Sequence, residues 1–315
     1  MLEQSNLNIV FVHGMGSYSS NDPGQVIAHL VSSLGLTSKG NKEIQQVMFE
    51  GKQVGWIKES LYEHNTGHSV RFKEVDWEIS TYGSKLQAFE IDNDKNDTRH
   101  ARLPKHSEIK RLQNFSLGDV ALYLNPSVRP GIQEATRVAL QDIGASLDEG
   151  DDQSTRSVVI GYSLGSRIVF DIMDEASSDD NQKKINEFTA SVDRFFMLAN
   201  QLSLLGLAID GSMTKQETKS YFSYFDTKQN NEKNGKQFKI IAITDPNDHL
   251  SYRIEKTMFD SAIGDQILDI DCSVAKRAYL VPSIGWMVNP ATAHTRYGNT
   301  ERVLDLITNG YTLTE

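Results

Sequence analysis

The 315-residue chain has one cysteine, no long apolar run and fewer basic than acidic residues. The lone cysteine, Cys272, excludes an intramolecular disulfide and offers no cysteine cluster for zinc. No run approaches the roughly 18 apolar residues of a membrane span, so no transmembrane helix is expected. The 32 basic and 42 acidic residues give a net charge of -10, which argues against nucleic acid or anionic lipid headgroups as partners. The polar N-terminal segment lacks the features of a signal peptide, and we predict a cytoplasmic protein.

Strand-like and helix-like segments alternate along the chain. Short β-branched and aromatic runs predict strands at residues 8–12, 69–77, 157–160, 194–199, 238–244 and 278–282. Apolar residues at helical spacing, with start signals, predict helices at 24–36, 42–64, 129–147, 164–175 and 300–309. This alternation predicts a single α/β domain over residues 1–315, with a doubly wound, mostly parallel sheet flanked by helices.

Residues 79–117 interrupt the alternation. The stretch is polar, charged and weakly periodic, which predicts short helices and a mobile loop rather than sheet. Its position ahead of the strand at 157–160 suits an inserted cap near an active site. An ordinary surface insertion is equally compatible with the pattern.

A serine between two glycines follows the strand at 157–160, in Gly161-Tyr162-Ser163-Leu164-Gly165. The apolar strand before it and the amphipathic helix after it are the setting of a nucleophile elbow. Such a turn holds its serine in a strained backbone conformation and requires small residues two positions away on each side. The N-terminus of the following helix favours developing negative charge near the serine. Ser163 is therefore the predicted nucleophile.

A glycine-containing loop, Val12-His13-Gly14-Met15-Gly16, follows the first predicted strand. An acyl-transfer enzyme needs two N–H donors aimed at the oxyanion of its tetrahedral intermediate. We predict that the backbone N–H groups of Leu164 and Met15 form this oxyanion hole, with Gly16 as the alternative to Met15. His13 precedes the serine in the chain, and we expect it to orient this loop rather than to act as the base.

Two histidines, His249 and His294, follow the serine. In a fold built around such an elbow, the acid and then the base follow the nucleophile along the chain. His249 adjoins the acid candidates, whereas His294 lies in a loop before the last predicted helix, so His294 is the predicted base. Asp245 and Asp248 follow the strand at 238–244. We favour Asp248 as the acid, with Asp245 as the alternative, because aspartate before proline commonly caps a turn.

With these motifs, the chain resembles the α/β-hydrolase superfamily, and within it the intracellular serine esterases and lipases related to DDHD-type phospholipases A1. The resemblance rests on residues 118–124, 159–171, 245–252 and 293–297. It departs from that branch at Tyr162, where relatives often carry histidine. The resemblance implies an α/β-hydrolase fold and a lipid-type ester as substrate.

The predicted triad of Ser163, His294 and Asp248 indicates a serine hydrolase that cleaves carboxylic esters through an acyl-enzyme. The expected partner is a small-molecule or lipid ester, and no metal or organic cofactor is required. A thioesterase would use the same triad. An inactive hydrolase-fold module that binds a partner is the alternative from another class.

Overall fold

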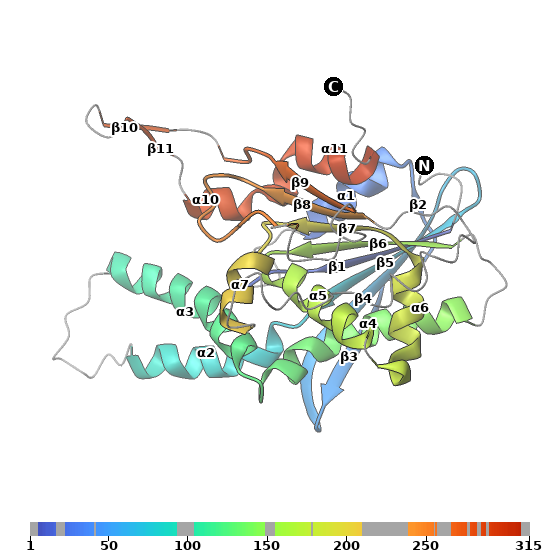
Figure 1. Cartoon of the computed structure of the whole chain (residues 1–315), viewed down its shortest axis with the longest axis horizontal. Helices are drawn as coiled ribbons and strands as arrows, with labels where there is room; N and C mark the ends of the chain where they lie inside the picture. The colour runs from blue at the N-terminus through green and yellow to red at the C-terminus, as the bar shows by residue number, and fades with distance from the viewer. Residues whose placement is uncertain are drawn as a thin grey trace.

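The structure is a computed structural model that describes residues 6–16, 23–40, 42–92, 104–148, 155–177, 179–209, 239–254, 256, 266–275, 278–281, 285–287 and 290–309. In this part of the chain a nine-stranded sheet has the order β2-β4-β5-β1-β6-β7-β8-β9, with β3 also paired to β4 (Figure 1). Neighbouring strands from β5 to β9 in this order run parallel, and the pairs that involve β4 are antiparallel. The strands are β1 (Leu7–Val12), β2 (Thr37–Ser38), β3 (Glu43–Phe49), β4 (Lys52–Glu63), β5 (Ser69–Asp76), β6 (Arg156–Tyr162), β7 (Val192–Leu198), β8 (Lys239–Thr244) and β9 (Ile267–Asp271).

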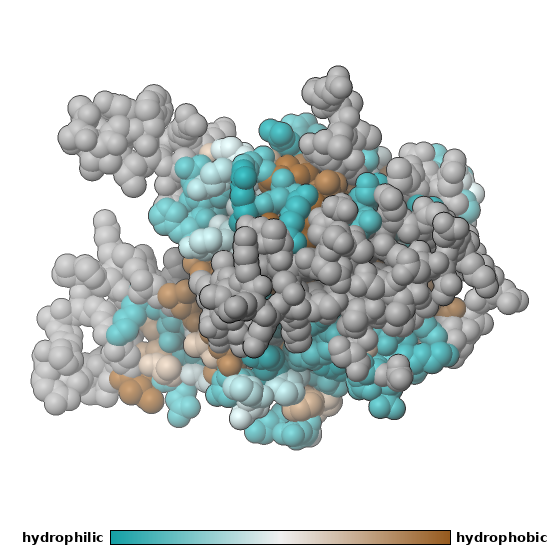
Figure 2. Space-filling model, in the orientation of Figure 1, coloured by the Kyte–Doolittle hydropathy of each residue, from teal (hydrophilic) through white to brown (hydrophobic). Residues whose placement is uncertain are grey.

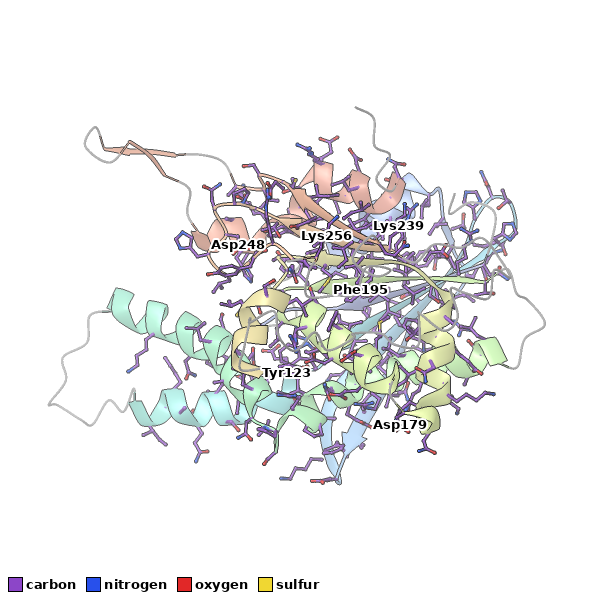
Figure 3. All side chains as sticks on the ribbon, in the orientation of Figure 1. Tyr123, Asp179, Phe195, Lys239, Asp248 and Lys256 are labelled. Carbon is purple, nitrogen blue, oxygen red and sulfur yellow. The ribbon has the colours of Figure 1, made fainter. Side chains whose placement is uncertain are left out.

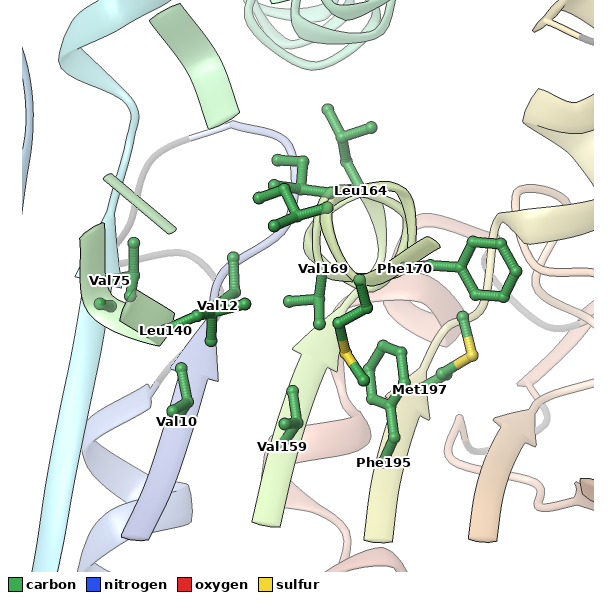
Figure 4. Packing of buried hydrophobic residues seen from close by; sticks show 14 of the residues in the cluster. Val10, Val12, Val75, Leu140, Val159, Leu164, Val169, Phe170, Phe195 and Met197 are labelled. Atoms are coloured by element: carbon green, nitrogen blue, oxygen red, sulfur yellow. The ribbon is translucent and has the colours of Figure 1, made fainter. Parts of the chain in front are cut away.

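Helices cover both faces of this sheet. One face packs against α1 (Pro23–Ser33) and α11 (Glu301–Asn309), and the other against α4 (Arg129–Asp148), α5 (Leu164–Ser177) and α6 (Lys183–Ser191). Strand β1 shows how its alternating side chains divide: Val10 and Val12 join the cluster under α4 and α5, while Ile9 and Phe11 join the cluster under α1 and α11. Both faces are buried, which explains the continuous apolar run of this strand. Figure 4 shows α5 packed over β1, β6 and β7.

The segment between β5 and β6 contains a pair of long helices, α2 (Ile79–Asp92) and α3 (Pro104–Leu124), ahead of α4. They lie side by side and extend beyond the edge of the sheet (Figure 1). Large apolar side chains that are exposed on this helix pair are Ile79, Tyr82, Ile91 and Leu117. Figure 2 shows brown, hydrophobic residues at the lower left, where Figure 1 places the two helices. The remaining elements are α7 (Leu202–Ile209), α10 (Pro290–Thr295), the 3-10 helices Asp180–Gln182 and Tyr297–Asn299, and the hairpin of β10 (Ala278–Val281) and β11 (Gly285–Met287).

The predicted α/β architecture with a mostly parallel sheet flanked by helices is confirmed. The predicted strands and the helices around residues 24–36, 129–147, 164–175 and 300–309 match observed elements. The 79–117 segment is helical rather than sheet, as expected, although its helices are long; the loop predicted within it lies largely outside the described residues. Among the described residues, no helix combines the length and apolar character that a membrane span requires.

The prediction of a helix over residues 42–64 is wrong, because this segment forms the antiparallel hairpin of β3 and β4. Glu50 and Gly51 form its two-residue turn, both with positive φ (48° and 76°), the backbone that a tight hairpin requires. Glutamate, glutamine, lysine and methionine give the segment helix propensity, but pairing with β5 decides its conformation. Strand β9 was not predicted, and β10 pairs with β11 outside the main sheet.

Candidate active site

Ser163 occupies the turn between β6 and α5 and has a backbone φ of 51°. A positive φ is uncommon for a residue with a side chain and persists only where the surroundings hold it. Here the Ser163 N–H donates a hydrogen bond to the Leu198 carbonyl of the neighbouring strand at 2.7 Å. The turn places the serine beyond the carboxyl end of a central strand and directly before the N-terminus of a helix.

The glycines on either side of Ser163 are required by packing. A Cβ on Gly161 would lie 2.6 Å from the Ser166 Cα, and a Cβ on Gly165 would lie 2.3 Å from the Val12 carbonyl oxygen. A Cβ atom cannot lie this close to a backbone atom, so any residue other than glycine would force the backbone to move. The expectation that the elbow needs residues without bulk at these positions is confirmed.

Replacing Gly165 by alanine is expected to destabilise the fold by about 3 kcal/mol, because the methyl group must displace backbone. The carbonyl oxygens of Val12 and His13 would lie 2.3 and 2.4 Å from it. Thermal unfolding followed by circular dichroism measures the effect. Gly83→Ala in α2 is the matched control: its Cβ meets nothing within 4 Å. This change should stabilise the helix by about 0.5–1 kcal/mol. Equal melting temperatures for the two variants would contradict the close approach at Gly165.

Ser163, His294 and Asp248 form a continuous hydrogen-bonded chain. The serine Oγ lies 2.9 Å from His294 Nε2. On the other side of the ring, His294 Nδ1 lies 3.0 and 2.9 Å from the two carboxylate oxygens of Asp248. A carboxylate only accepts, so Nδ1 carries the proton and Nε2 is left to accept from the serine hydroxyl. All three side chains are buried.

Two separate segments of the chain bring His294 and Asp248 to Ser163. His294 lies on the short helix α10 rather than in the loop that the sequence predicts. Asp248 lies in the turn after β8, and Figure 3 shows it beside α10. These elements meet at the carboxyl ends of the parallel strands, the edge at which β6 delivers Ser163.

Two tyrosines hold Asp248 and His294 in place. The Tyr297 hydroxyl donates to Asp248 Oδ2 at 3.1 Å and accepts the Asp245 N–H at 2.7 Å. Burial, followed by the charge of Asp248, raises the pKa of Tyr297 well above its usual range, so this hydroxyl remains a donor at working pH. Tyr162 donates to the backbone carbonyl of His294 at 2.8 Å. No local sequence signal marks either role, since both depend on contacts between distant segments.

The structure separates the two acid candidates. Asp245 accepts hydrogen bonds from the backbone N–H groups of Asn247, Val274 and Ala275, at 2.8, 2.7 and 3.2 Å. Burial alone would raise the pKa of the Asp245 carboxyl, but these backbone donors lower it below its usual value. Asp245 thus joins the β8 turn to the segment after β9, whereas Asp248 contacts the histidine.

The loop after β1 lies next to the elbow, because Val12 pairs with Gly161 in the parallel register of β1 and β6. At the end of this loop, Gly16 has a φ of 88° and its N–H donates to Asp119 Oδ2 at 2.8 Å. That N–H already has an acceptor, which disfavours the alternative donor Gly16. For the backbone N–H groups of Met15 and Leu164, no acceptor occurs within the described residues.

His13 is fully buried and orients this loop. Its ring stacks on Trp77 with ring centroids 4.7 Å apart. Its Nδ1 lies 2.7 Å from the Gly14 carbonyl oxygen, and its Nε2 accepts the Trp77 backbone N–H at 3.2 Å. The Trp77 indole N–H donates to the His13 carbonyl at 3.0 Å. These contacts match the loop-orienting role expected from the sequence.

No known protein-family model matches the chain, and no curated protein is significantly similar to it in sequence. Within the described residues, no three or more His, Cys, Asp or Glu side chains are grouped for a metal ion.

Proposed function

We propose that this protein is a serine hydrolase of the α/β-hydrolase type that cleaves carboxylic esters. The observation that carries the proposal is the hydrogen-bonded chain from Ser163 through His294 to Asp248. A serine hydroxyl is a weak nucleophile unless a base accepts its proton, and the base needs a third group that fixes its tautomer. Here both partners lie within hydrogen-bond distance of His294.

The arrangement of the sheet supports the same assignment. The nucleophile follows a central parallel strand in a strained turn, the acid follows β8, and the base precedes the last described helix. This chain order of serine, aspartate and histidine is the order of the α/β-hydrolase fold. Trypsin-like and subtilisin-like proteases use other orders, so the order favours this fold over theirs.

In the proposed reaction, His294 Nε2 takes the Ser163 proton as Oγ attacks the ester carbonyl. The negative charge that develops on the carbonyl oxygen is stabilised by the backbone N–H groups of Met15 and Leu164. The histidine then gives its proton to the leaving alkoxide, which releases the alcohol and leaves an acyl-serine. A water molecule, activated by the same histidine, hydrolyses the acyl-serine and restores the hydroxyl. Asp248 keeps the imidazole oriented throughout.

The resemblance to DDHD-type phospholipases A1 supports a lipid-type acyl ester as the substrate. Two of the apolar residues that follow β7, Leu202 and Leu205, are buried in the core cluster with α5, so they support the fold rather than line an acyl pocket. The acyl preference is read from rates with p-nitrophenyl esters from acetate to palmitate.

A fluorophosphonate probe tests the proposal directly, because it reacts covalently only with an activated serine. We expect wild-type protein to be labelled, and mass spectrometry of the digest to place the label on the peptide that contains Ser163. Heat-denatured protein is the control and should not react, since an unfolded chain has no base beside the serine. Folded wild type that shows neither label nor esterase activity would contradict the hydrolase proposal and favour a binding module.

A further inference from the structure

A buried ion pair connects α2 to α3 beside the loop after β1. Lys85 Nζ lies 2.6 Å from Asp119 Oδ1, and the side chains are 1% and 0% exposed. The Thr81 hydroxyl donates to the same carboxylate oxygen at 2.6 Å. Removing two charged side chains from water costs free energy that their attraction does not always offset. A buried ion pair is therefore weak evidence that it stabilises the fold. Their position therefore calls for a role beyond the stability of the helix pair.

The second oxygen of the carboxylate points to that role. Asp119 Oδ2 accepts the backbone N–H of Gly16, a residue 103 positions earlier in the chain. The start of the same loop is held by Trp77 through His13. Met15 lies between these two attachment points, so their positions determine where its backbone N–H points.

Lysine and aspartate suit this location because they sum to no net charge. An unpaired carboxylate near the elbow would repel the oxyanion that forms on the substrate. With Lys85 and Thr81 on one oxygen, the carboxylate keeps a strong acceptor for Gly16 while its charge is balanced. A neutral acceptor would hold the loop less tightly, since hydrogen bonds to charged groups are the stronger ones.

We propose that Asp119, balanced by Lys85, is a positioning residue that holds the loop after β1 in the conformation that completes the oxyanion hole. The inference rests on the proposed hydrolase function. In this role the α2–α3 segment positions the oxyanion-hole loop through Gly16, whether or not it also covers the substrate.

A pair of double variants isolates the hydrogen bond to Gly16. Lys85→Met with Asp119→Asn removes both charges but keeps a side-chain oxygen that can accept the Gly16 N–H. Lys85→Met with Asp119→Leu removes the charges and the acceptor at similar volume. The measurements are kcat and KM for a p-nitrophenyl ester that wild type hydrolyses, and the affinity for a trifluoromethyl ketone, which forms a tetrahedral adduct with the serine.

We expect kcat of the leucine double variant to be about 10²-fold below that of the asparagine double variant, the scale of losing one oxyanion donor. KM should differ by less than about threefold, and ketone affinity should fall in parallel with kcat, because the lost interaction acts on the tetrahedral state. Equal kcat and equal ketone affinity in the two double variants would overturn the inference. Wild type that is neither active nor labelled by fluorophosphonate would overturn the proposed function as well.

Two further variants separate positioning from folding. Thr81→Val removes one hydroxyl donor to Asp119 without burying an unpaired charge, and is expected to lower kcat about 3- to 10-fold at unchanged KM. If the double variants do not fold, Thr81→Val tests the inference alone. An unchanged kcat in this variant would then overturn it. Lys73→Met is the control, since Lys73 is also buried and pairs with Glu59 at 2.6 Å, away from this loop. Its kcat should match wild type.

Discussion

Replacing Ser163 by alanine is expected to lower kcat for p-nitrophenyl esters by about 10⁶-fold, the order found when a triad nucleophile is removed. The reason is that the acyl-enzyme cannot form, and a water molecule in its place has no fixed position. Residual hydrolysis should remain above the rate in buffer, because the oxyanion hole still stabilises the intermediate. Initial rates measured on freshly purified wild type and variant, at saturating substrate, give the comparison.

A folded control is essential, since Ser163 sits in a strained backbone conformation. Alanine can hold a positive φ in this fold, as the buried Ala199 does at 52°, so Ser163→Ala should melt close to wild type. Ser163→Gly should be equally inactive but more stable than Ser163→Ala by about 1 kcal/mol, because glycine relieves the strain. Activity in either variant at more than about a hundredth of wild type would assign the chemistry to another group.

The contacts of His294 with Ser163 and Asp248 could be predicted because the signals for these residues are local and follow a fixed order in the sequence. Gly161 and Gly165 bracket the serine for reasons of packing, and only His249 and His294 compete for the role of base. The architecture followed from apolar strands alternating with amphipathic helices. The sequence favours Asp248 over Asp245 because aspartate before proline commonly caps a turn, and the observed contacts distinguish the two.

The rest could not be predicted because it depends on contacts between segments far apart in the chain. Asp119 meets Gly16 across 103 positions, and Tyr297 meets Asp248 across 49. Neither pair leaves a pattern in the sequence around it. The prediction of a helix at β3 and β4 is wrong for a related reason. Helix-favouring residues form strands there because β5 supplies a pairing partner. Local propensity decides an element only where tertiary pairing does not compete.

Replacing Asp248 by asparagine is expected to lower kcat/KM by about 10⁴-fold, the order seen when a triad acid becomes an amide. The amide nitrogen can donate to His294 Nδ1, which favours the tautomer that carries its proton on Nε2. That tautomer cannot accept the Ser163 proton. The Tyr297 hydroxyl and the Leu250 N–H donate to different oxygens of Asp248, at 3.1 and 3.0 Å. The variant should fold, because its single amide oxygen can still accept from one of these two donors.

The comparison variant is Asp245→Asn, which changes stability rather than chemistry. Its carboxylate accepts the backbone N–H groups of Val274 and Ala275, and an amide nitrogen turned toward them would leave donors unpaired. We expect a lower melting temperature, with kcat of the folded protein within about tenfold of wild type. Because the pKa of Asp245 is lowered on folding, its ionised form stabilises the fold at neutral pH. This contribution is lost as pH falls below the unfolded value of about 3.9 and through the folded pKa.

The two asparagine variants should therefore differ in opposite ways, one in activity and the other in stability. Asp248→Asn should lose activity at every pH at which wild type is active. Asp245→Asn should keep activity while its stability falls less steeply than that of wild type as pH is lowered from about 5 to 2, since the group that loses its charge is gone. Urea unfolding at a series of pH values, with ester hydrolysis measured at neutral pH, separates them. If Asp245→Asn instead lost activity by about 10⁴-fold and Asp248→Asn did not, the acid of the triad would be Asp245 and the contact of His294 with Asp248 would be structural.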